Sequence, residues 1–376
     1  MKKYLSFWEA FATIVGTVIG LGIFAIPFAA KNAGVTPTVA LIIFVAVMSV
    51  LVSILYAEIV IFDKREECII SYARRYLGQW AGKAETCSAL FGYTGSILAY
   101  VLAIAVFTKA LIPHDGIYFW PIVLFYTAIS GLVLLLKKTK NLGNLEIVLA
   151  GIMCLAFVLV SWESVSQWKP LKEDWSEVVV PYGVVWFSMT GGSAIPITVR
   201  ILGRRGKKVF NAIFFAYVLI ALVTILFFVA ALKTGGVKIG PDPFITMGEK
   251  MGNWVFYVGT LIGVLAVTTS HWTLATHFKN VLNEDLKFSP ITSWLLVVFL
   301  PLILILIGIS NFVSVIGLVG LVAGTFDALL LLAIYKKIFS RENTVPRVLP
   351  FKLPGVVLWA AFLLLFAAAL SSVLTM

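Results

Sequence analysis

The chain has 376 residues and a formal net charge of +11; 61% of its residues are hydrophobic and only 12% are charged. This composition excludes a soluble globular protein, which could not bury so much apolar surface, and predicts an integral membrane protein. The basic residues cluster in alternate segments between apolar runs, so the charge reflects membrane topology and we expect no nucleic-acid partner.

Apolar runs recur along the whole chain. A helix of about 20 apolar residues crosses a hydrocarbon core about 30 Å thick. We therefore predict an all-α membrane protein with eleven transmembrane helices, at about 8–32, 36–62, 86–111, 118–136, 144–162, 178–201, 208–232, 252–278, 289–309, 312–335 and 351–374. The connecting segments are too short for a separate soluble domain, so residues 1–376 are predicted to form one transmembrane domain. The first run is too long for a signal-peptide core, and we expect it in the mature protein.

The positions of lysine and arginine predict the orientation. With a cytoplasmic amino terminus, most of the 29 basic residues fall in cytoplasmic segments, as the positive-inside rule requires. An odd number of spans then places the carboxyl terminus outside. We expect a multi-pass protein of the inner or plasma membrane of the cell.

The sequence contains no recognisable catalytic pattern. Cys68, Cys87 and Cys154 form no CxxC pair, the three histidines are scattered, and no phosphate-binding loop is present. We therefore predict neither an enzyme nor an ATP-driven pump. No cofactor or metal is expected beyond a coupling ion, either sodium or a proton.

The first apolar run is interrupted by the stretch GTVIGLGIF, which places Gly16, Gly20 and Gly22 near mid-membrane, with Pro27 just beyond. Each glycine weakens a helix by about 1 kcal/mol relative to alanine. An unwound stretch survives in a bilayer only where it faces protein or a water-filled cavity. Taken alone, the pattern fits equally well a small-residue stripe for close helix packing.

The sixth run carries its own interruption, FSMTGGSAIP, between Phe187 and Pro196. Interrupted spans at corresponding places in two halves are typical of inverted-repeat transporters, whose substrate binds between the breaks. We predict a five-plus-five inverted repeat with discontinuous helices 1 and 6. The repeats cover about 8–162 and 178–335, and an accessory helix covers about 351–374.

The ends of broken helices predict a site for a zwitterion. Free N–H groups at a helix amino terminus attract a carboxylate, and free carbonyls at a carboxyl terminus attract an ammonium group. The predicted carboxylate ligands are the amides of Leu21, Gly22 and Ile23. The remaining predicted substrate-binding residues are Thr17, Val18 and Ile19 in the first break, Tyr100 in the third span, and Trp186, Phe187, Ser188, Thr190 and Gly191 in the sixth.

Three motifs carry a family resemblance: GTVIGLGIFAIPFAAKNAGV in the first span, YAE at Tyr56 to Glu58, and FSxxGGxxIP in the sixth span. Together they resemble the amino acid, polyamine and organocation (APC) superfamily, especially its aromatic and hydroxy amino acid permease branch and the related eukaryotic-type amino acid transporters. The resemblance implies the LeuT-like five-plus-five fold. It also implies secondary active transport of amino acids driven by protons or sodium.

The resemblance also implies a coupling-ion site. In sodium-coupled members of the superfamily, hydroxyl groups on span eight and carbonyls at the first break bind a cation. The matching candidates here are Thr268, Thr269 and Ser270 with the carbonyls of Gly16 and Ile19. The alternative is that these hydroxyl groups bond to the preceding helical turn.

Two acidic residues in apolar runs are candidates for proton coupling, because a charge buried in a membrane costs about 3 kcal/mol or more. They are Glu58 in the second span and Asp327 in the tenth. The alternative is that each pairs with cytoplasmic lysine or arginine as an inner gate or anchor. Gly317, Gly320 and Gly324 in the tenth span are predicted to allow close helix packing.

The sequence thus predicts a proton- or sodium-coupled symporter of neutral amino acids, aromatic ones included, working by alternating access. The alternatives are an amino-acid-sensing receptor subunit similar to germinant receptors, and an amine or polyamine exchanger. Few acidic residues lie at the breaks, which argues against a polyamine, since a dication needs a carboxylate beside it. The expected partners are an amino acid and the lipid bilayer. The sequence is compatible with a monomer, and it leaves the oligomeric state, the ion and the substrate side chain open.

Overall fold

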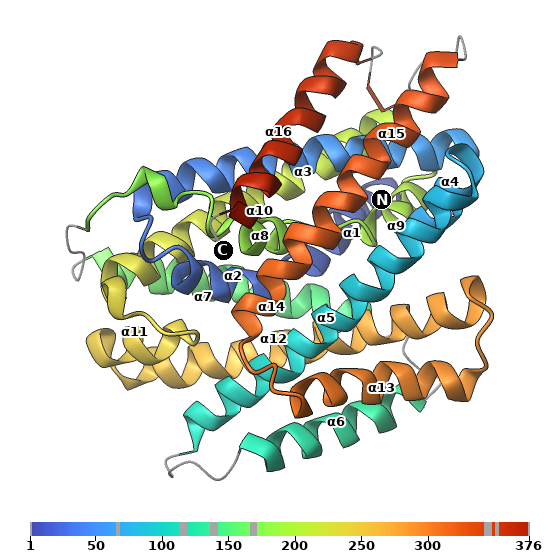
Figure 1. Cartoon of the computed structure of the whole chain (residues 1–376). Coiled ribbons are helices and arrows are strands. Elements are labelled where there is room, and N and C mark those ends of the chain that lie inside the picture. Colours follow the sequence, from blue (N-terminus) through green and yellow to red (C-terminus); the bar gives the residue numbers. More distant parts are fainter. Residues whose placement is uncertain are drawn as a thin grey trace.

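The computed structural model describes residues 2–64, 68–112, 119–135, 142–165, 171–341, 348–349 and 353–374 (Figure 1). The described residues form helices joined by short connections, without a β-strand among them. This confirms the predicted all-α class.

The helices of the first half of the chain are α1 (Lys2–Val18), α2 (Leu21–Ala29), α3 (Val35–Asp63), α4 (Ile69–Tyr76), α5 (Gln79–Leu111), α6 (Phe119–Leu135) and α7 (Leu142–Ser164). Those of the second half are α8 (Tyr182–Ser188), α9 (Ala194–Ile201), α10 (Gly206–Gly235), α11 (Pro243–Met251), α12 (Asn253–Asn280), α13 (Pro290–Leu306), α14 (Phe312–Val319), α15 (Thr325–Arg341) and α16 (Gly355–Leu374). Two π-helical turns continue neighbouring helices: η4 (Val281–Asp285) follows α12, and η5 (Gly320–Gly324) joins α14 to α15.

Each of the eleven predicted runs contains a helix or a pair of helices. Among the described residues, six helices are long and apolar enough to cross a membrane, or seven if the bent pair α1 and α2 forms one span. The remaining runs contain shorter apolar helices: α6 and α13 have 17 residues each, the apolar part of α7 is Val148–Ser164, and the sixth run is divided between α8 and α9. Length and composition thus support an integral membrane protein, while the number eleven stays a prediction.

Both predicted interruptions are breaks in the helices. The first apolar run stops at Val18 and resumes at Leu21 with a bend of 45°. Gly20, the last residue before α2, has φ −158° and ψ −148°, an extended backbone that ends the helical hydrogen-bond pattern. In the sixth run, helix α8 ends at Ser188 and α9 begins at Ala194.

An aromatic cluster holds α2 in place. Phe24 makes edge-to-face contacts with one ring on each of four other helices, at centroid distances of 5.6–6.0 Å. Its partners are Phe107 of α5, Phe157 of α7, Phe227 of α10 and Phe244 of α11, and all five rings are buried. Such pairs contribute about 0.5–1.5 kcal/mol each beyond the burial of their area. These contacts hold α2, the helix after the first break, against α5, α7, α10 and α11.

The two halves of the chain make matching contacts. Between them, α3 packs on α10, α5 on α12, and α6 on α13. Within them, α1 contacts α7 as α8 contacts α14, and the short helix α4 lies on α5 as α11 lies on α12. Helices α4 and α11 lie at opposite ends of the bundle (Figure 1). Each is followed by a glycine with positive φ that starts the next long helix: Gly78 at +101° and Gly252 at +109°.

Glycines bring the tenth predicted span close to the sixth, as predicted. A Cβ atom built at Gly320 would lie 1.9 Å from the carbonyl oxygen of Gly183, and one at Gly324 would lie 2.6 Å from Cδ1 of Trp186. Gly317 also approaches α8, since a Cβ there would lie 3.3 Å from Cγ2 of Val184. These glycines therefore let η5 pack directly on the backbone of α8.

We predict that Gly320→Ala lowers the free energy of unfolding by about 1–3 kcal/mol, because the methyl group overpacks the contact with Gly183. The measurement is thermal unfolding in detergent. Gly151→Ala is the matched control, since a Cβ at Gly151 has no atom within 4 Å. Alanine there should leave stability unchanged or raise it by up to about 1 kcal/mol. Equal unfolding temperatures for the two variants would contradict the assigned contact.

Candidate functional site

The two helix breaks touch each other. A Cβ atom built at Gly22, in the first turn of α2, would lie 2.5 Å from Cβ and 2.6 Å from Cα of Ser188, the last residue of α8. On the other side, a Cβ at Gly191 would lie 2.5 Å from Cγ2 of Val18, the last residue of α1. Only glycine fits at either position without displacing a neighbour.

This contact brings helix ends of opposite polarity together. The amino terminus of α2 meets the carboxyl terminus of α8 around Gly22 and Ser188. A helix amino terminus carries about half a positive charge and a carboxyl terminus about half a negative charge. The breaks therefore combine donors for an anion and acceptors for a cation within one small region.

At the first break, the main-chain N–H groups of some predicted residues already have acceptors within the protein. The N–H of Ile19 still donates to the carbonyl of Val15 at 2.9 Å, so the last turn of α1 reaches Ile19. The N–H of Ile23, predicted to bind a carboxylate, donates instead to the carbonyl of Gly20 at 3.3 Å. Leu21 and Gly22 begin α2, where the first N–H groups have no acceptor within the helix. Leu21 and Gly22 therefore keep the main-chain donors on which the carboxylate prediction depends.

The hydroxyl groups near the breaks are bonded to their own helices. Thr17 Oγ1 donates to the carbonyl of Thr13 at 2.8 Å, Ser188 Oγ to that of Val185 at 2.8 Å, and Thr190 Oγ1 to that of Trp186 at 2.8 Å. The carbonyl of Phe187, a predicted ammonium ligand, accepts the N–H of Thr190 at 3.3 Å. These three hydroxyl groups and the Phe187 carbonyl therefore already have hydrogen-bond partners within the protein.

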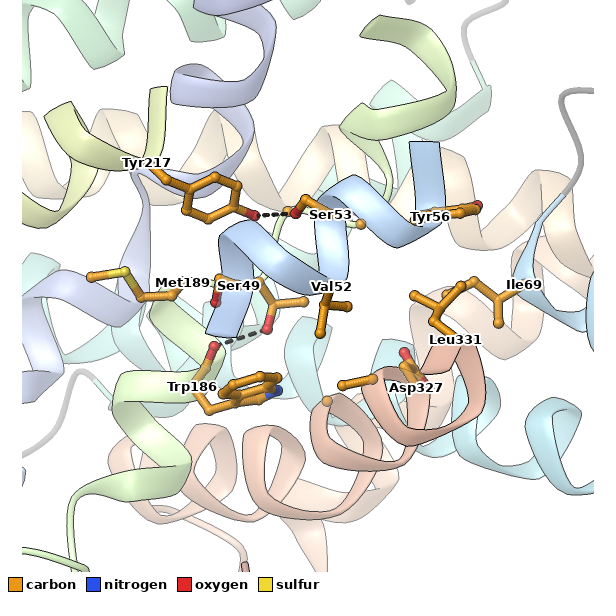
Figure 2. A pocket seen from close by; sticks show the side chains of 15 residues that line it. Ser49, Val52, Ser53, Tyr56, Ile69, Trp186, Met189, Tyr217, Asp327 and Leu331 are labelled. Carbon is orange, nitrogen blue, oxygen red and sulfur yellow. Dashed lines mark hydrogen bonds between the residues drawn. The ribbon is translucent and has the colours of Figure 1, made fainter. Parts of the chain in front are cut away.

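A cavity of about 50 Å³ adjoins the second break. Its lining comes from α3, the start of α4, α8 and the α8–α9 break, α10 and the η5–α15 segment. It consists of Ser49, Val52, Ser53, Tyr56, Ile69, Trp186, Met189, Thr190, Gly191, Gly192, Tyr217, Gly324, Asp327, Ala328 and Leu331. Figure 2 shows Tyr217 and Ser53 on one side of this lining and Trp186 and Asp327 on the other. The lining is mostly apolar and aromatic, with one carboxylate.

Of the predicted substrate residues, Trp186, Thr190 and Gly191 line this cavity. The predicted residues of the first break do not line the cavity; Val18 packs on Gly191, and Gly22 packs on Ser188. Tyr100 lies elsewhere: its ring is 6.2 Å from that of His271, on the side of α12 that faces α6. Ser53 and Tyr217, which sequence reasoning missed, line the cavity and share a hydrogen bond of 3.0 Å.

The three predicted hydroxyl residues of α12, Thr268, Thr269 and Ser270, make different contacts. Ser270 lies beside the first break, with its Oγ 3.3 Å from a Cβ built at Gly20. Thr269 Oγ1 bonds to carbonyls of its own preceding turn, those of Ala266 at 3.0 Å and Leu265 at 3.2 Å. Thr268 interacts with Tyr126 of α6. Thr268 and Ser270 therefore contact different helices, and Thr269 makes the bond to the preceding turn that is the alternative to a sodium site; the sodium site stays a prediction.

His271 is buried and hydrogen-bonded. Its Nδ1 lies 2.6 Å from the hydroxyl oxygen of Tyr126, and its side chain is only 3% exposed. The pair joins α12 to α6 at a distance from the cavity lining. It is a packing contact between two spans.

The candidate carboxylates Glu58 and Asp327 occupy different environments. Glu58 is buried, and its Oε1 accepts the N–H groups of Val348 and Leu349, each at 2.8 Å. It anchors the segment between α15 and α16. Asp327 lines the cavity and accepts a hydrogen bond of 3.2 Å from Ser88 of α5.

A further carboxylate, Glu85, lies beside Asp327, and sequence reasoning missed it. The third apolar run was predicted to begin at residue 86, whereas α5 begins at Gln79 and carries Glu85 into the helix bundle. The stretch QWAGKAET before the apolar run contains no proline and could have indicated that the helix begins ahead of residue 86.

We predict that Tyr217→Phe lowers the free energy of unfolding by about 1 kcal/mol, because it removes the buried hydrogen bond to Ser53. The control is Tyr257→Phe, since Tyr257 is 56% exposed. Thermal unfolding of both variants in detergent provides the measurement. An unchanged unfolding temperature for Tyr217→Phe would show that the Ser53 bond does not stabilise the cavity wall.

Comparisons with known proteins identify the family. The sequence profile of the tryptophan/tyrosine permease family matches residues 3–374, which is nearly the whole chain. A search of curated proteins found no match. The wider placement in the APC superfamily stays a prediction. The chain belongs to the tryptophan/tyrosine permease family.

Proposed function

We propose that this protein is an ion-coupled importer of tryptophan, tyrosine and related neutral amino acids, driven by protons or sodium. Family membership implies amino acid transport across a membrane. The observation that carries the more specific proposal is the contact between the two helix breaks, in which Gly22 packs on Ser188 and Gly191 on Val18. Apposed ends of broken helices are suited to a small zwitterion.

The backbone of an amino acid substrate would bind at the breaks. The amides of Leu21 and Gly22 would receive its carboxylate, assisted by the positive end of α2. Its ammonium group would bind the carbonyls of Ser188 and Thr190 at the negative end of α8. The substrate backbone is therefore recognised by main-chain groups, so recognition would not depend on any one side chain.

The cavity wall favours an aromatic substrate side chain. Trp186 and Tyr217 line it from opposite sides, and aromatic rings pack well against an indole or a phenol. The buried Nε1 of Trp186 has no hydrogen-bond partner among the described residues, and it is a donor available to a polar substrate atom. At about 50 Å³ the cavity is too small for an aromatic amino acid. The described state is therefore closed, and binding requires the lining helices to separate.

The matching contacts of the two halves support an inverted repeat and alternating access. Under this proposal the repeats are about 8–162 and 178–335, with α16 as the accessory eleventh span. The pairs α3 and α10, α5 and α12, and α6 and α13 are then related by the repeat. Since each half has five spans, an odd number, the halves insert with opposite orientation, which fits α4 and α11 at opposite ends of the bundle (Figure 1).

The orientation follows the positive-inside prediction. The end of the bundle that holds α4 would face the cytoplasm, and the end that holds α11 would face outward. The cavity, bounded by Tyr56 and Leu331 toward the α4 end, would then lie on the cytoplasmic side of the breaks. The structure would represent a state closed to the outside, because the Phe24 cluster fills the other side.

Transport is tested with purified protein in liposomes. We expect labelled tryptophan to accumulate only when a proton or sodium gradient is imposed, and unlabelled tyrosine to compete. A receptor would instead bind tryptophan, detected as thermal stabilisation, without net flux. Competition by putrescine but not by tyrosine would favour the amine exchanger.

Two glycine variants test the contact between the breaks. Gly191→Ala should lower the affinity for tryptophan about tenfold or more, because its methyl group displaces Val18 and separates the breaks; tenfold corresponds to about 1.4 kcal/mol. Gly151→Ala should have little effect, since a Cβ there has no atom within 4 Å and Gly151 lies outside the cavity lining. Affinity is measured by tryptophan-dependent thermal stabilisation. Equal losses in both variants would contradict a site built on the contact between the breaks.

A further inference from the structure

Glu85 and Asp327 form a pair of acidic side chains between α5 and α15. Ser88, one helical turn after Glu85 on α5, donates to Asp327 Oδ1 at 3.2 Å, which brings the carboxyl groups of Glu85 and Asp327 near each other. Glu85 is only 2% exposed, and its Oε2 has no hydrogen-bond partner among the described residues. Asp327 lines the cavity (Figure 2). One member of the pair thus faces the cavity while the other is enclosed by protein.

Two carboxylates in this position cannot both be ionised at low cost. An ionised carboxylate accepts hydrogen bonds and donates none, so a hydrogen bond between the two groups would require a shared proton. Like charges in contact disfavour double ionisation, and burial adds to that cost. The only other hydrogen bond to the pair in the described structure comes from Ser88 Oγ, at 3.2 Å from Asp327 Oδ1.

The basic residues on the neighbouring helices do not neutralise the pair. Arg75 of α4 forms an ion pair with Asp63, Lys83 of α5 lies over Trp80, and Lys279 of α12 donates to the carbonyl of Leu134. Arg74 of α4 and Lys336 and Lys337 of α15 are exposed. Among the described residues, no ion pair to Glu85 or Asp327 is present.

The other titratable groups around the pair are weak acids, a histidine and one more carboxylate. They are Tyr56 of α3, Cys68 and Tyr72 at α4, Tyr93 of α5, His277 of α12 and Asp285 of η4. Tyr93 stacks on Phe278 and contacts His277, so it closes the α12 side of the pair. None of these groups supplies a positive charge in direct contact with Glu85 or Asp327.

We propose that Glu85 and Asp327 together hold one exchangeable proton and that this proton is the coupling ion of the transporter. The proposal rests on the ion-coupled transport proposed above and names its ion. The proton binds from water as the pair becomes singly protonated, and it returns to water in the cavity through Asp327. This step moves only the proton and neither forms nor breaks another covalent bond.

The position of the pair links the proton to the substrate site. Asp327 lies one helical turn after Gly324, which packs against the indole of Trp186 with a built Cβ 2.6 Å from Cδ1. Loss of the proton would leave two anions between α5 and α15 and push these helices apart. Because α15 continues η5, this separation would move the wall on which Trp186 rests. Proton release and opening of the cavity are therefore coupled.

Isosteric variants test the pair. Glu85→Gln and Asp327→Asn should each reduce tryptophan accumulation driven by a pH gradient at least tenfold. Both should retain exchange of labelled for unlabelled tryptophan, which needs no net proton movement. Glu249→Gln is the control, since Glu249 lies on the exposed surface of α11. Retained accumulation in both pair variants would overturn the proposal.

A measurement on the unmodified protein remains decisive even if a variant fails to fold. Tryptophan is added in weakly buffered solution with a pH indicator, and the proton change per bound tryptophan is recorded between pH 5 and 8. We expect a pH-dependent proton change, absent in the Glu85→Gln, Asp327→Asn double variant. Tryptophan accumulation driven by sodium alone, without proton movement, would refute the proton pair but leave the transporter intact. Binding without accumulation under any gradient would refute transport itself.

Discussion

The structure depends on satisfying backbone groups at two places where a helix stops inside an apolar bundle. An unpaired N–H or C=O in a bilayer costs several kcal/mol, so a broken span needs protein or water beside it. Here each break covers the other. Glycine permits this because Gly22 and Gly191 have no Cβ to hold the chains apart. The same contact leaves helix ends of opposite polarity side by side, and this is the chemistry that an amino acid backbone requires.

The surroundings of the breaks differ on their two sides. Toward α11, Phe24 is surrounded by four aromatic rings, and the packing is dense. Toward α15, a small cavity separates Trp186 from Tyr217, and polar groups such as Asp327 face it. A dense aromatic contact resists separation more than a partly polar cavity does. The proposed proton pair lies on the side that is easier to open.

Part of this architecture could be predicted from local patterns. Apolar run lengths, the glycine stretches beginning at Gly16 and Gly191, and the small-residue contacts of Gly320 all follow from helix propensity and membrane solvation, and the structure confirms the breaks and the contacts. Side-chain direction could not be predicted. Thr268, Thr269 and Ser270 are consecutive in the sequence, yet Thr268 contacts Tyr126, Ser270 lies beside Gly20 and Thr269 bonds to its own helix, because the rotation of α12 is set by its packing on α5 and α7.

The sequence by itself determined the membrane class, the all-helical content, the positions of both breaks and, through the family profile, the amino acid permease identity. Only the tertiary structure decided that Glu85 meets Asp327, that Glu58 instead anchors Val348 and Leu349, and that Tyr100 turns toward His271. The physical reason is distance along the chain. Helix propensity and hydropathy act over a few residues, whereas the contacts that define an ion site join helices far apart in sequence.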